Sequence, residues 1–222
     1  MAAVDVAALR PKPSVPLKQA MPRQERGARP ARPLPYSLQV HAETAADRIA
    51  LTFVNDGSAG AAFSLWSAQA DEGPWFYTVG AGERLVAEHP LGADGYDLTV
   101  QGPNGFLRRF AGAAGEEPVV EAVYDPASGR ILLTLKTSGA AQRLTVTPGV
   151  YRHGAARVHA LEAGGTVVDA WPLARTAHWY DLIVTSEADP RWLRRLSGHL
   201  ETGRPSLSDP AMGLGAVREG ES

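Results

Sequence analysis

The sequence predicts an all-β protein made of two tandem immunoglobulin-like β-sandwich domains after a Pro-rich N-terminal linker. Three observations support this prediction. From Tyr36 onward, short runs of alternating or β-branched residues are separated by clusters of Gly, Asn, Asp and Pro. Helical periodicity is nearly absent from the same region. The second half of the chain also repeats the first half at a nearly constant spacing.

The repeat is clearest in two pairs of segments. RIALTFVNDG at 48–57 aligns with RILLTLKTSG at 130–139, sharing five of ten residues at a spacing of 82. YDLTVQGPNGFLRRFAG at 96–112 aligns with YDLIVTSEADPRWLRRLSG at 180–198, where a small loop insertion has increased the spacing to 84. This period is longer than that of solenoid repeats, so each unit is expected to be a small domain that buries its own core.

The turn signals divide the chain into four segments. These are a basic Pro-rich linker at 1–35, a β-sandwich repeat 1 at 36–114, a β-sandwich repeat 2 at 115–204 and a C-terminal tail at 205–222. Seven strands are expected in repeat 1, near 36–42, 48–55, 61–68, 74–79, 83–88, 95–101 and 105–111. Seven more are expected in repeat 2, near 118–124, 130–137, 142–148, 156–161, 166–171, 179–185 and 192–197. Short strands at this regular spacing are typical of an immunoglobulin-like Greek key.

The strand at 48–55 illustrates the pattern. Ile49, Leu51 and Phe53 alternate with other residues, which places them on one inward face. The following Asn55-Asp56-Gly57 tolerates left-handed backbone and predicts a tight hairpin.

The linker is set apart by its prolines and its charge. Residues 1–35 hold seven prolines, which remove backbone donors and keep the chain extended. The segment has seven Lys or Arg against two acids, a net +5, so a whole-chain charge of −2 leaves −7 on the remainder. We interpret the segment as a solvated tether; the alternative is an ordered arm packed on the first domain.

Composition excludes several classes of protein. An overall charge of −2 argues against a general nucleic-acid binder. The absence of cysteine rules out disulfides, thiolate metal sites and a Cys nucleophile. The opening MAAVDVAAL is interrupted by Asp5 and lacks the features of a signal peptide, and no window approaches the roughly 18 apolar residues of a membrane span.

The sequence lacks the common motifs of nucleophilic catalysis, phosphate binding and zinc binding. It contains no GxSxG, no GxxxxGK[ST] and no HExxH. The six histidines are scattered at His41, His89, His153, His159, His178 and His199. We therefore predict no catalytic, cofactor-binding or metal-binding residue. Among the tryptophans, Trp66, Trp75 and Trp179 are expected in the core or at its rim, and Trp171 and Trp192 are expected to be partly exposed.

One duplicated composite is a candidate docking surface. An aromatic residue precedes two arginines in both copies, as Phe106-Leu107-Arg108-Arg109 and as Trp192-Leu193-Arg194-Arg195. Guanidinium groups beside an aromatic ring could bind anionic headgroups or phosphates. The candidate docking residues are Phe106, Arg108, Arg109, Trp192, Arg194 and Arg195. The alternative interpretation is a last strand in each domain whose Arg faces water.

The two YDL segments, with the lead-in QERGARPARPLPYSL and the closing SDPAMG, resemble the C-terminal region of bacterial phosphocholine-specific phospholipases C. The resemblance extends from about Pro22 to Gly213. It implies that catalysis belongs to a larger upstream domain of alkaline-phosphatase-like type, which uses metal and an activated hydroxyl to cleave the headgroup phosphodiester. The active-site residues of that domain have no counterparts in this sequence.

The resemblance thus implies a non-catalytic C-terminal accessory module, inactive alone, with a structural or membrane- or partner-docking role. Its partner would be the phospholipase C catalytic domain, in cis or as a separate chain, with a phospholipid membrane surface as a further candidate. As part of such an enzyme the chain would be extracytoplasmic or secreted. The alternative is a free-standing ligand-binding or adhesion protein that uses its rim aromatics and Arg pairs.

Overall fold

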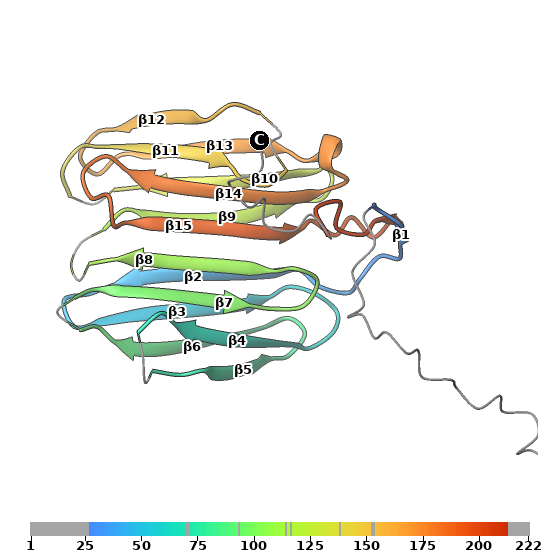
Figure 1. Ribbon diagram of the computed structural model, residues 1–222, viewed down its shortest axis with the longest axis horizontal. Helices are drawn as coiled ribbons and strands as arrows, with labels where there is room; N and C mark the ends of the chain where they lie inside the picture. The colour runs from blue at the N-terminus through green and yellow to red at the C-terminus, as the bar shows by residue number, and fades with distance from the viewer. Residues whose placement is uncertain are drawn as a thin grey trace, which may run out of the picture.

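The computed structural model describes residues 27–212 except 70, 71, 93, 114, 116, 138, 152 and 153 (Figure 1). Repeat 1 contributes β2 (Leu38–Thr44), β3 (Arg48–Asn55), β4 (Ala61–Ser67), β5 (Trp75–Val79), β6 (Glu83–Pro90), β7 (Tyr96–Gln101) and β8 (Leu107–Gly112). Repeat 2 contributes β9 (Val119–Asp125), β10 (Arg130–Lys136), β11 (Gln142–Pro148), β12 (Arg157–Leu161), β13 (Thr166–Pro172), β14 (Trp179–Ser186) and β15 (Leu193–His199). All fourteen predicted strands are confirmed, with each end within two residues of its expected position.

Each repeat is a sandwich of two antiparallel sheets. In repeat 1 a three-stranded sheet, β2-β3-β6, faces the strands β5-β4-β7-β8. In repeat 2 the sheet β9-β10-β13 faces β12-β11-β14-β15. Strands that are distant in sequence, such as β3 and β6 or β4 and β7, are hydrogen-bonded neighbours. The all-β prediction is confirmed, and this strand order is compatible with an immunoglobulin-like Greek key.

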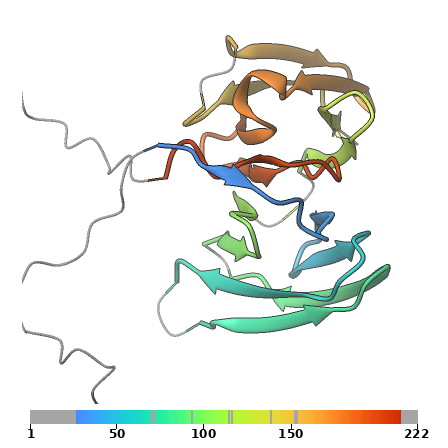
Figure 2. The ribbon, with the colours of Figure 1, turned by 90° about the vertical axis from the view of Figure 1, so that its right-hand side faces the viewer.

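The two large sheets are joined into one. Strand β8 pairs antiparallel with β15, and this creates a continuous eight-stranded sheet that runs through both repeats (Figure 1). Arg109 lies opposite Arg195 in the register. Because these two arginines are equivalent positions of the repeat, a local two-fold axis passes between them, as in a symmetric dimer interface. Figure 2 shows the two repeats lying on either side of this junction.

Each repeat has its own hydrophobic core. The alternating residues Ile49, Leu51 and Phe53 are fully buried in the core of repeat 1, as predicted. The corresponding Ile131 and Leu133 are fully buried in the core of repeat 2. Burial of these apolar side chains provides the main favourable term for folding each sandwich.

The predicted hairpin at Asn55 is wrong. Strand β3 does not pair with β4, because the chain crosses from one sheet of the sandwich to the other. The buried Asn55 side chain organises this crossing. Its amide nitrogen donates to the carbonyl oxygens of Ala59, Val79 and Gly80 at 2.8, 3.2 and 3.1 Å, and its oxygen accepts from the backbone N–H of Gly57 at 3.0 Å.

The predicted exposure of two tryptophans is also wrong. Trp171 points inward from β13, and Trp192, which immediately precedes β15, is buried in the same core of repeat 2. Trp179 is buried and Trp75 is half-buried, as expected for core or rim positions. Trp66, in contrast, lies on the outer face of the eight-stranded sheet and is 46% exposed.

Two short strands were not predicted. Strand β1 (Pro30–Ala31) pairs with β16 (Ser206–Leu207), which brings the described part of the Pro-rich segment against the tail. Residues 27–35 are therefore ordered, but Pro30 and Ala31 pair with the tail and not with the first domain, which was the stated alternative. Residues 1–26 of the predicted linker and residues 213–222 of the predicted tail lie outside the described residues. The described residues also include a single-turn 3-10 helix, η1 (Ala174–Thr176). No helix in the described part of the chain has the length and apolarity needed to span a membrane.

Candidate functional site

Most of the candidate docking residues lie at the junction between the repeats. We call this junction the seam and define it as the pairing of β8 with β15 together with the side chains of Tyr96, Arg108, Tyr180 and Arg194. In both strands alternate residues point inward, and this places Arg108 and Arg194 inside the molecule. Both arginines are buried, so their charges must be met by protein groups.

Arg194 of repeat 2 reaches into repeat 1. Its Nη2 donates to the Tyr96 hydroxyl at 2.7 Å and to the Glu117 carboxylate at 2.8 Å, while Nη1 donates to the carbonyl oxygen of Ala111 at 2.8 Å. The Tyr96 hydroxyl also donates to Glu117. Burial raises the pKa of Tyr96, so the phenol is protonated and available as a donor. The result is a buried ion pair that shares one carboxylate oxygen of Glu117 with the Tyr96 hydroxyl, while the other oxygen, Oε1, is buried without a hydrogen-bond partner among the described residues.

Arg108 of repeat 1 makes the reciprocal contact with repeat 2. Its Nη2 donates to the Tyr180 hydroxyl at 2.9 Å and to the Gln39 side-chain oxygen at 2.8 Å, and its Nη1 donates to the carbonyl oxygen of Ser197 at 3.0 Å. The Tyr180 hydroxyl lies 2.5 Å from that of Tyr124. Unlike Arg194, Arg108 is surrounded by neutral partners.

The aromatic residue of each composite lies against the buried arginine that follows it. The Arg108 guanidinium carbon lies 4.3 Å from the Phe106 ring centroid, and that of Arg194 lies 4.7 Å from the Trp192 ring centroid. Cation–π attraction is stronger in such a desolvated setting than at a surface. The repeated spacing therefore places an aromatic ring against a buried guanidinium inside the seam in both repeats.

The second arginine of each pair points to the outer face. Arg109 forms a two-pronged ion pair with Asp97 at 2.7 and 2.6 Å, and Arg195 forms one with Asp181 at 2.8 and 2.9 Å. Burial alone would raise the pKa of Asp181, but hydrogen bonds from Arg195 and Ser197 lower it below its ordinary value. Both arginines are half-exposed, and each is held by an aspartate of its own repeat.

The docking hypothesis is therefore wrong for four of its six residues. Phe106, Arg108, Trp192 and Arg194 are buried because the two strands that carry them pair with each other. The sequence reasoning missed their partners, Tyr96, Tyr180 and Glu117. The sequence does contain a signal for the tyrosines, because Tyr-Asp precedes Leu-Arg-Arg in both copies. In both copies the Tyr bonds the first Arg of the other repeat, and the Asp bonds the second Arg of its own repeat.

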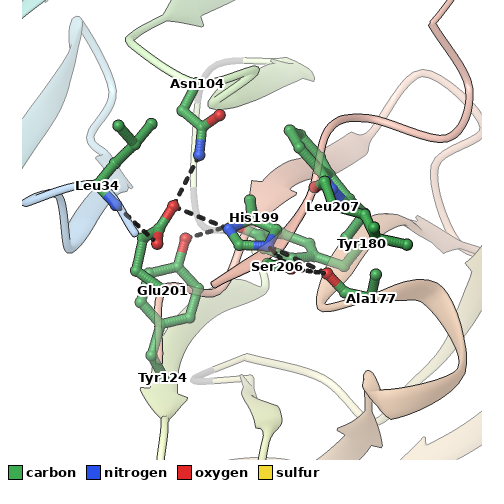
Figure 3. Close-up of polar contacts among 10 residues, drawn as sticks. Leu34, Asn104, Tyr124, Ala177, Tyr180, His199, Glu201, Ser206 and Leu207 are labelled. Carbon is green, nitrogen blue, oxygen red and sulfur yellow. Dashed lines mark hydrogen bonds and ion pairs between the residues drawn. The ribbon is translucent and has the colours of Figure 1, made fainter. Parts of the chain in front are cut away.

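A second polar cluster joins the arm and the tail to both repeats (Figure 3). We call it the clasp; it comprises Arg29–Leu34, Asn104, His199, Glu201 and Ser206–Ser208. Glu201 is its centre. One carboxylate oxygen lies 2.9 Å from both the Asn104 amide nitrogen and His199 Nδ1, and the other accepts from the Leu34 backbone N–H at 3.1 Å. A single side chain thus ties the arm, the β7–β8 turn and the end of β15 together.

His199, Glu201 and Ser206 have the connectivity of a nucleophile, base and acid set. His199 Nε2 lies 3.1 Å from Ser206 Oγ, but it also lies 3.1 Å from the carbonyl oxygen of Ala177. Nε2 and the serine hydroxyl therefore both lie against the same carbonyl oxygen. Ser206 Oγ itself donates to Ala177 at 3.0 Å. The arrangement acts as a structural clamp rather than as an activated nucleophile.

Metal ligands are not clustered in the part of the chain that the structure describes: no group of three or more His, Asp or Glu there is placed to hold an ion. His159 contacts Asp169 at 2.9 Å within repeat 2, and His89 contacts the Tyr77 hydroxyl at 2.9 Å within repeat 1. His153 lies outside the described residues.

Comparison with known proteins identifies the duplicated unit. The family described as bacterial phospholipase C, C-terminal domain, matches the chain twice, over residues 30–113 and 118–199. A non-hemolytic phospholipase C of Burkholderia pseudomallei is 46% identical over 89% of this chain and 30% of its own length. A non-hemolytic phospholipase C of Pseudomonas aeruginosa is 41% identical over 93% of this chain and 32% of its own length.

A hemolytic phospholipase C of Pseudomonas aeruginosa is 35% identical over 90% of this chain and 32% of its own length. The chain therefore spans about a third of the length of these curated relatives. Both copies of the repeat fall within the matched family, and together they include β8, β15 and the four side chains of the seam, whereas Glu201 and Ser206–Ser208 of the clasp lie beyond the matched residues. This chain belongs to the family of bacterial phospholipase C C-terminal domains.

Proposed function

We propose that this chain is the non-catalytic C-terminal accessory module of a phospholipase C and that it forms a rigid base for the catalytic part of the enzyme. The observation that carries the proposal is the clasp. The arm that precedes the sandwiches is bonded to the tail through β1 and β16 and to Glu201 through Leu34. A polypeptide segment that enters through this arm would therefore have a fixed starting point on the module.

The clasp also presents an apolar surface suited to a neighbouring domain. Leu34, Leu207 and Met212 are 39, 41 and 46% exposed and line one hollow of about 240 Å³. Exposed apolar residues that gather at one place favour a protein contact over free solvent. We infer that the catalytic part, which would precede the arm, packs on this surface.

A chimera tests the proposal. In it, this chain replaces the matching C-terminal third of the Burkholderia pseudomallei relative, and phospholipase C activity and thermal unfolding are measured. We expect an active enzyme that loses thermal stability when Leu34→Asp and Leu207→Asp are introduced together. The matched control, Val158→Asp with Val168→Asp, changes two exposed valines remote from the clasp and should leave the stability unchanged.

Two outcomes would contradict the proposal. Phospholipase C activity of this chain by itself, above background, would show that it is not an accessory module. Equal stability of the two variant chimeras would show that the clasp is not the contact surface. The free-standing adhesion alternative is less favoured, since the Arg pairs that it would use are bonded within the protein.

A contact with lipid is a second candidate function, favoured by one observation. Phe76 and Trp66 are 73 and 46% exposed on the outer face of neighbouring strands β5 and β4. Exposed aromatic side chains suit the interface of a bilayer. Co-sedimentation with phosphatidylcholine vesicles should then fall when both are changed to serine, and unchanged sedimentation would exclude this role.

A further inference from the structure

An open depression lies on the outer face of the eight-stranded sheet in repeat 1, over the strands β4, β5 and β7. Its volume is about 360 Å³, which is within the usual range for small-molecule sites. Its lining includes the side chains of Ser64, Phe76, Thr78 and Gln101. β5 is the outermost strand of the sheet, so the depression lies near the sheet edge and away from the seam (Figure 1). The connections that contain residues 70, 71 and 93 join β4, β5 and β7 at their other end.

The strand register places three of these side chains in one row across the sheet. Ser64 is paired with Phe76 on one side and with Gln101 on the other. Neighbouring strands are about 4.8 Å apart, so the backbones of Phe76 and Gln101 are roughly 10 Å apart. The small side chain of Ser64 lies between them, which leaves room for a ligand between an aromatic ring and an amide.

These side chains are open to a ligand. Phe76 is 73% exposed, and Thr78 and Gln101 are exposed as well. Within the described residues, neither the Thr78 hydroxyl nor the Gln101 amide forms a hydrogen bond. The Ser64 hydroxyl accepts a hydrogen bond from the Trp66 indole N–H at 3.2 Å, and it can still donate its own proton. The depression therefore offers one open aromatic ring and three neutral groups that form hydrogen bonds.

The chemistry of the lining restricts the class of ligand. No described residue of the lining carries a charge, and on the same face Arg109 and Asp97 neutralise each other. A metal ion would need several oxygen ligands, most of them carboxylates, and a phosphate would need cationic donors. A purely apolar ligand would leave the amide and the hydroxyl groups without partners. An uncharged ligand with an apolar face and several hydroxyl groups avoids both costs.

Repeat 2 shows that the fold does not require this aromatic ring. The equivalent row consists of Val158, Thr145 and Thr185, which are paired in the same way across β12, β11 and β14. A valine and a threonine thus occupy the places of Phe76 and Gln101. Both sandwiches enclose a complete core with these different residues on the outer face. The ring and the amide of repeat 1 are therefore not explained by packing, and their presence favours a role in binding.

We propose that this depression binds one ring of a neutral carbohydrate, with Phe76 stacked on the C–H face of the sugar and Gln101 bonded to its hydroxyl groups. Ser64 and Thr78 supply further hydrogen bonds. The C–H groups of a pyranose carry a positive partial charge, which is attracted by the negative face of an aromatic ring. An amide both donates and accepts, as a sugar hydroxyl does. The proposal is independent of the proposed docking of the catalytic part, although Phe76 also belongs to the lipid candidate.

Calorimetric titration of the full chain with maltohexaose, cellohexaose and chitohexaose tests the proposal. We expect at least one of these neutral hexasaccharides to bind saturably in the millimolar range, and we expect the charged hexagalacturonate not to bind. Phe76→Ser and Gln101→Leu should each weaken binding by about tenfold. The matched controls, Val158→Ser and Thr185→Leu, make comparable changes at the equivalent positions of repeat 2 and should bind as the parent does. All four positions are exposed, so thermal unfolding of the variants should be unchanged.

Gln101→Leu also distinguishes this site from a contact with lipid. The substitution makes the surface more apolar, so it should weaken saccharide binding and leave sedimentation with phosphatidylcholine vesicles unchanged. Vesicle binding that falls with Phe76→Ser, in a chain that binds no hexasaccharide, would assign Phe76 to lipid and overturn the proposal. Failure of all three neutral hexasaccharides to bind, equal binding of hexagalacturonate, or equal affinity of the parent and the Phe76→Ser variant would also overturn it.

Discussion

Arg108 and Arg194 are the first arginines of the two Leu-Arg-Arg segments, and the buried charge of each is stabilised by a different set of partners. Each crosses the seam to the tyrosine of the other repeat, at 2.9 and 2.7 Å respectively. Arg194 also has the buried carboxylate of Glu117. Arg108 has instead the side-chain oxygen of Gln39. Replacing Arg194 leaves a buried carboxylate without its cation, whereas replacing Arg108 leaves only neutral groups. The two replacements should therefore reduce the free energy of unfolding by different amounts, since an unpaired buried charge is far more unfavourable than an unpaired neutral group.

The first prediction compares these two arginines. Arg194→Met should reduce the free energy of unfolding by about 3–5 kcal/mol, because the Glu117 carboxylate remains buried without its cation. Arg108→Met should cost less, about 1–3 kcal/mol, since only neutral partners are left. Urea unfolding followed by circular dichroism measures both. Adding Glu117→Gln to Arg194→Met should restore much of the stability, and a larger loss for Arg108→Met would refute this account.

The second prediction concerns pH and His41. Burial lowers the pKa of His41, with the charge of Arg108 acting in the same direction and that of Glu121 opposing it. A lowered folded-state pKa means that the unfolded chain binds the proton more readily. Stability should therefore be full above the unfolded pKa of about 6.5 and should decline as the pH falls below it.

Urea unfolding at pH 7.5 and pH 5.5 measures this decline, and His41→Gln should make it smaller. The remaining decline belongs to His89 and His178, whose pKa values are also lowered by burial. Asp181 does not contribute in this window. Its lowered pKa gives stability that is present above about pH 4 and is lost only as the pH falls further. An unchanged difference in the His41→Gln variant would contradict the assignment.

At the scale of elements, the sequence predicted strands well and their partners poorly. The alternation of Ile49, Leu51 and Phe53 is a local signal, and it correctly places β3 and its inward face. The pairing of β8 with β15 joins residues more than 80 positions apart, and nothing in either strand alone distinguishes a paired edge from a free one. For that reason the sequence alone predicts exposed positions for Trp192 and Arg194, which the pairing of the two strands buries.

The third prediction concerns the glycine that ends β8. A Cβ on Gly112 would lie 2.1 Å from a carboxylate oxygen of Glu117 and 3.1 Å from the hydroxyl of Tyr96. Gly112→Ala should therefore force these groups apart and reduce the free energy of unfolding by about 1–3 kcal/mol. Gly92→Ala is the control, because a Cβ there meets nothing within 4 Å. Thermal unfolding of both variants measures the effect, and similar melting temperatures would contradict it.

At the scale of the whole molecule, two separate cores share a single sheet. The duplication correctly predicted a core for each repeat, but it did not predict that the repeats are fused through β8 and β15. The seam buries the ion pair of Arg194 with Glu117, and the clasp ties Asn104 of repeat 1 to Glu201. Unfolding of either repeat would break the β8–β15 ladder, the hydrogen bonds of Arg108 and Arg194 to the tyrosine of the other repeat, and the contact of Asn104 with Glu201, so the remaining repeat should lose these stabilising contacts at the same time.

The final prediction follows from this coupling, and the tryptophans allow it to be measured. Repeat 1 contains Trp66 and Trp75, whereas repeat 2 contains Trp171, Trp179 and Trp192. In a variant with Trp66→Phe and Trp75→Phe, fluorescence reports repeat 2 alone, while circular dichroism reports the strands of both repeats. We expect the two urea transitions to coincide, as they must for a single cooperative unit. Adding Arg108→Met and Arg194→Met should separate them, because the seam then loses both of its crossing side chains. Separate transitions in the parent would show instead that the eight-stranded sheet joins two domains without coupling their stability.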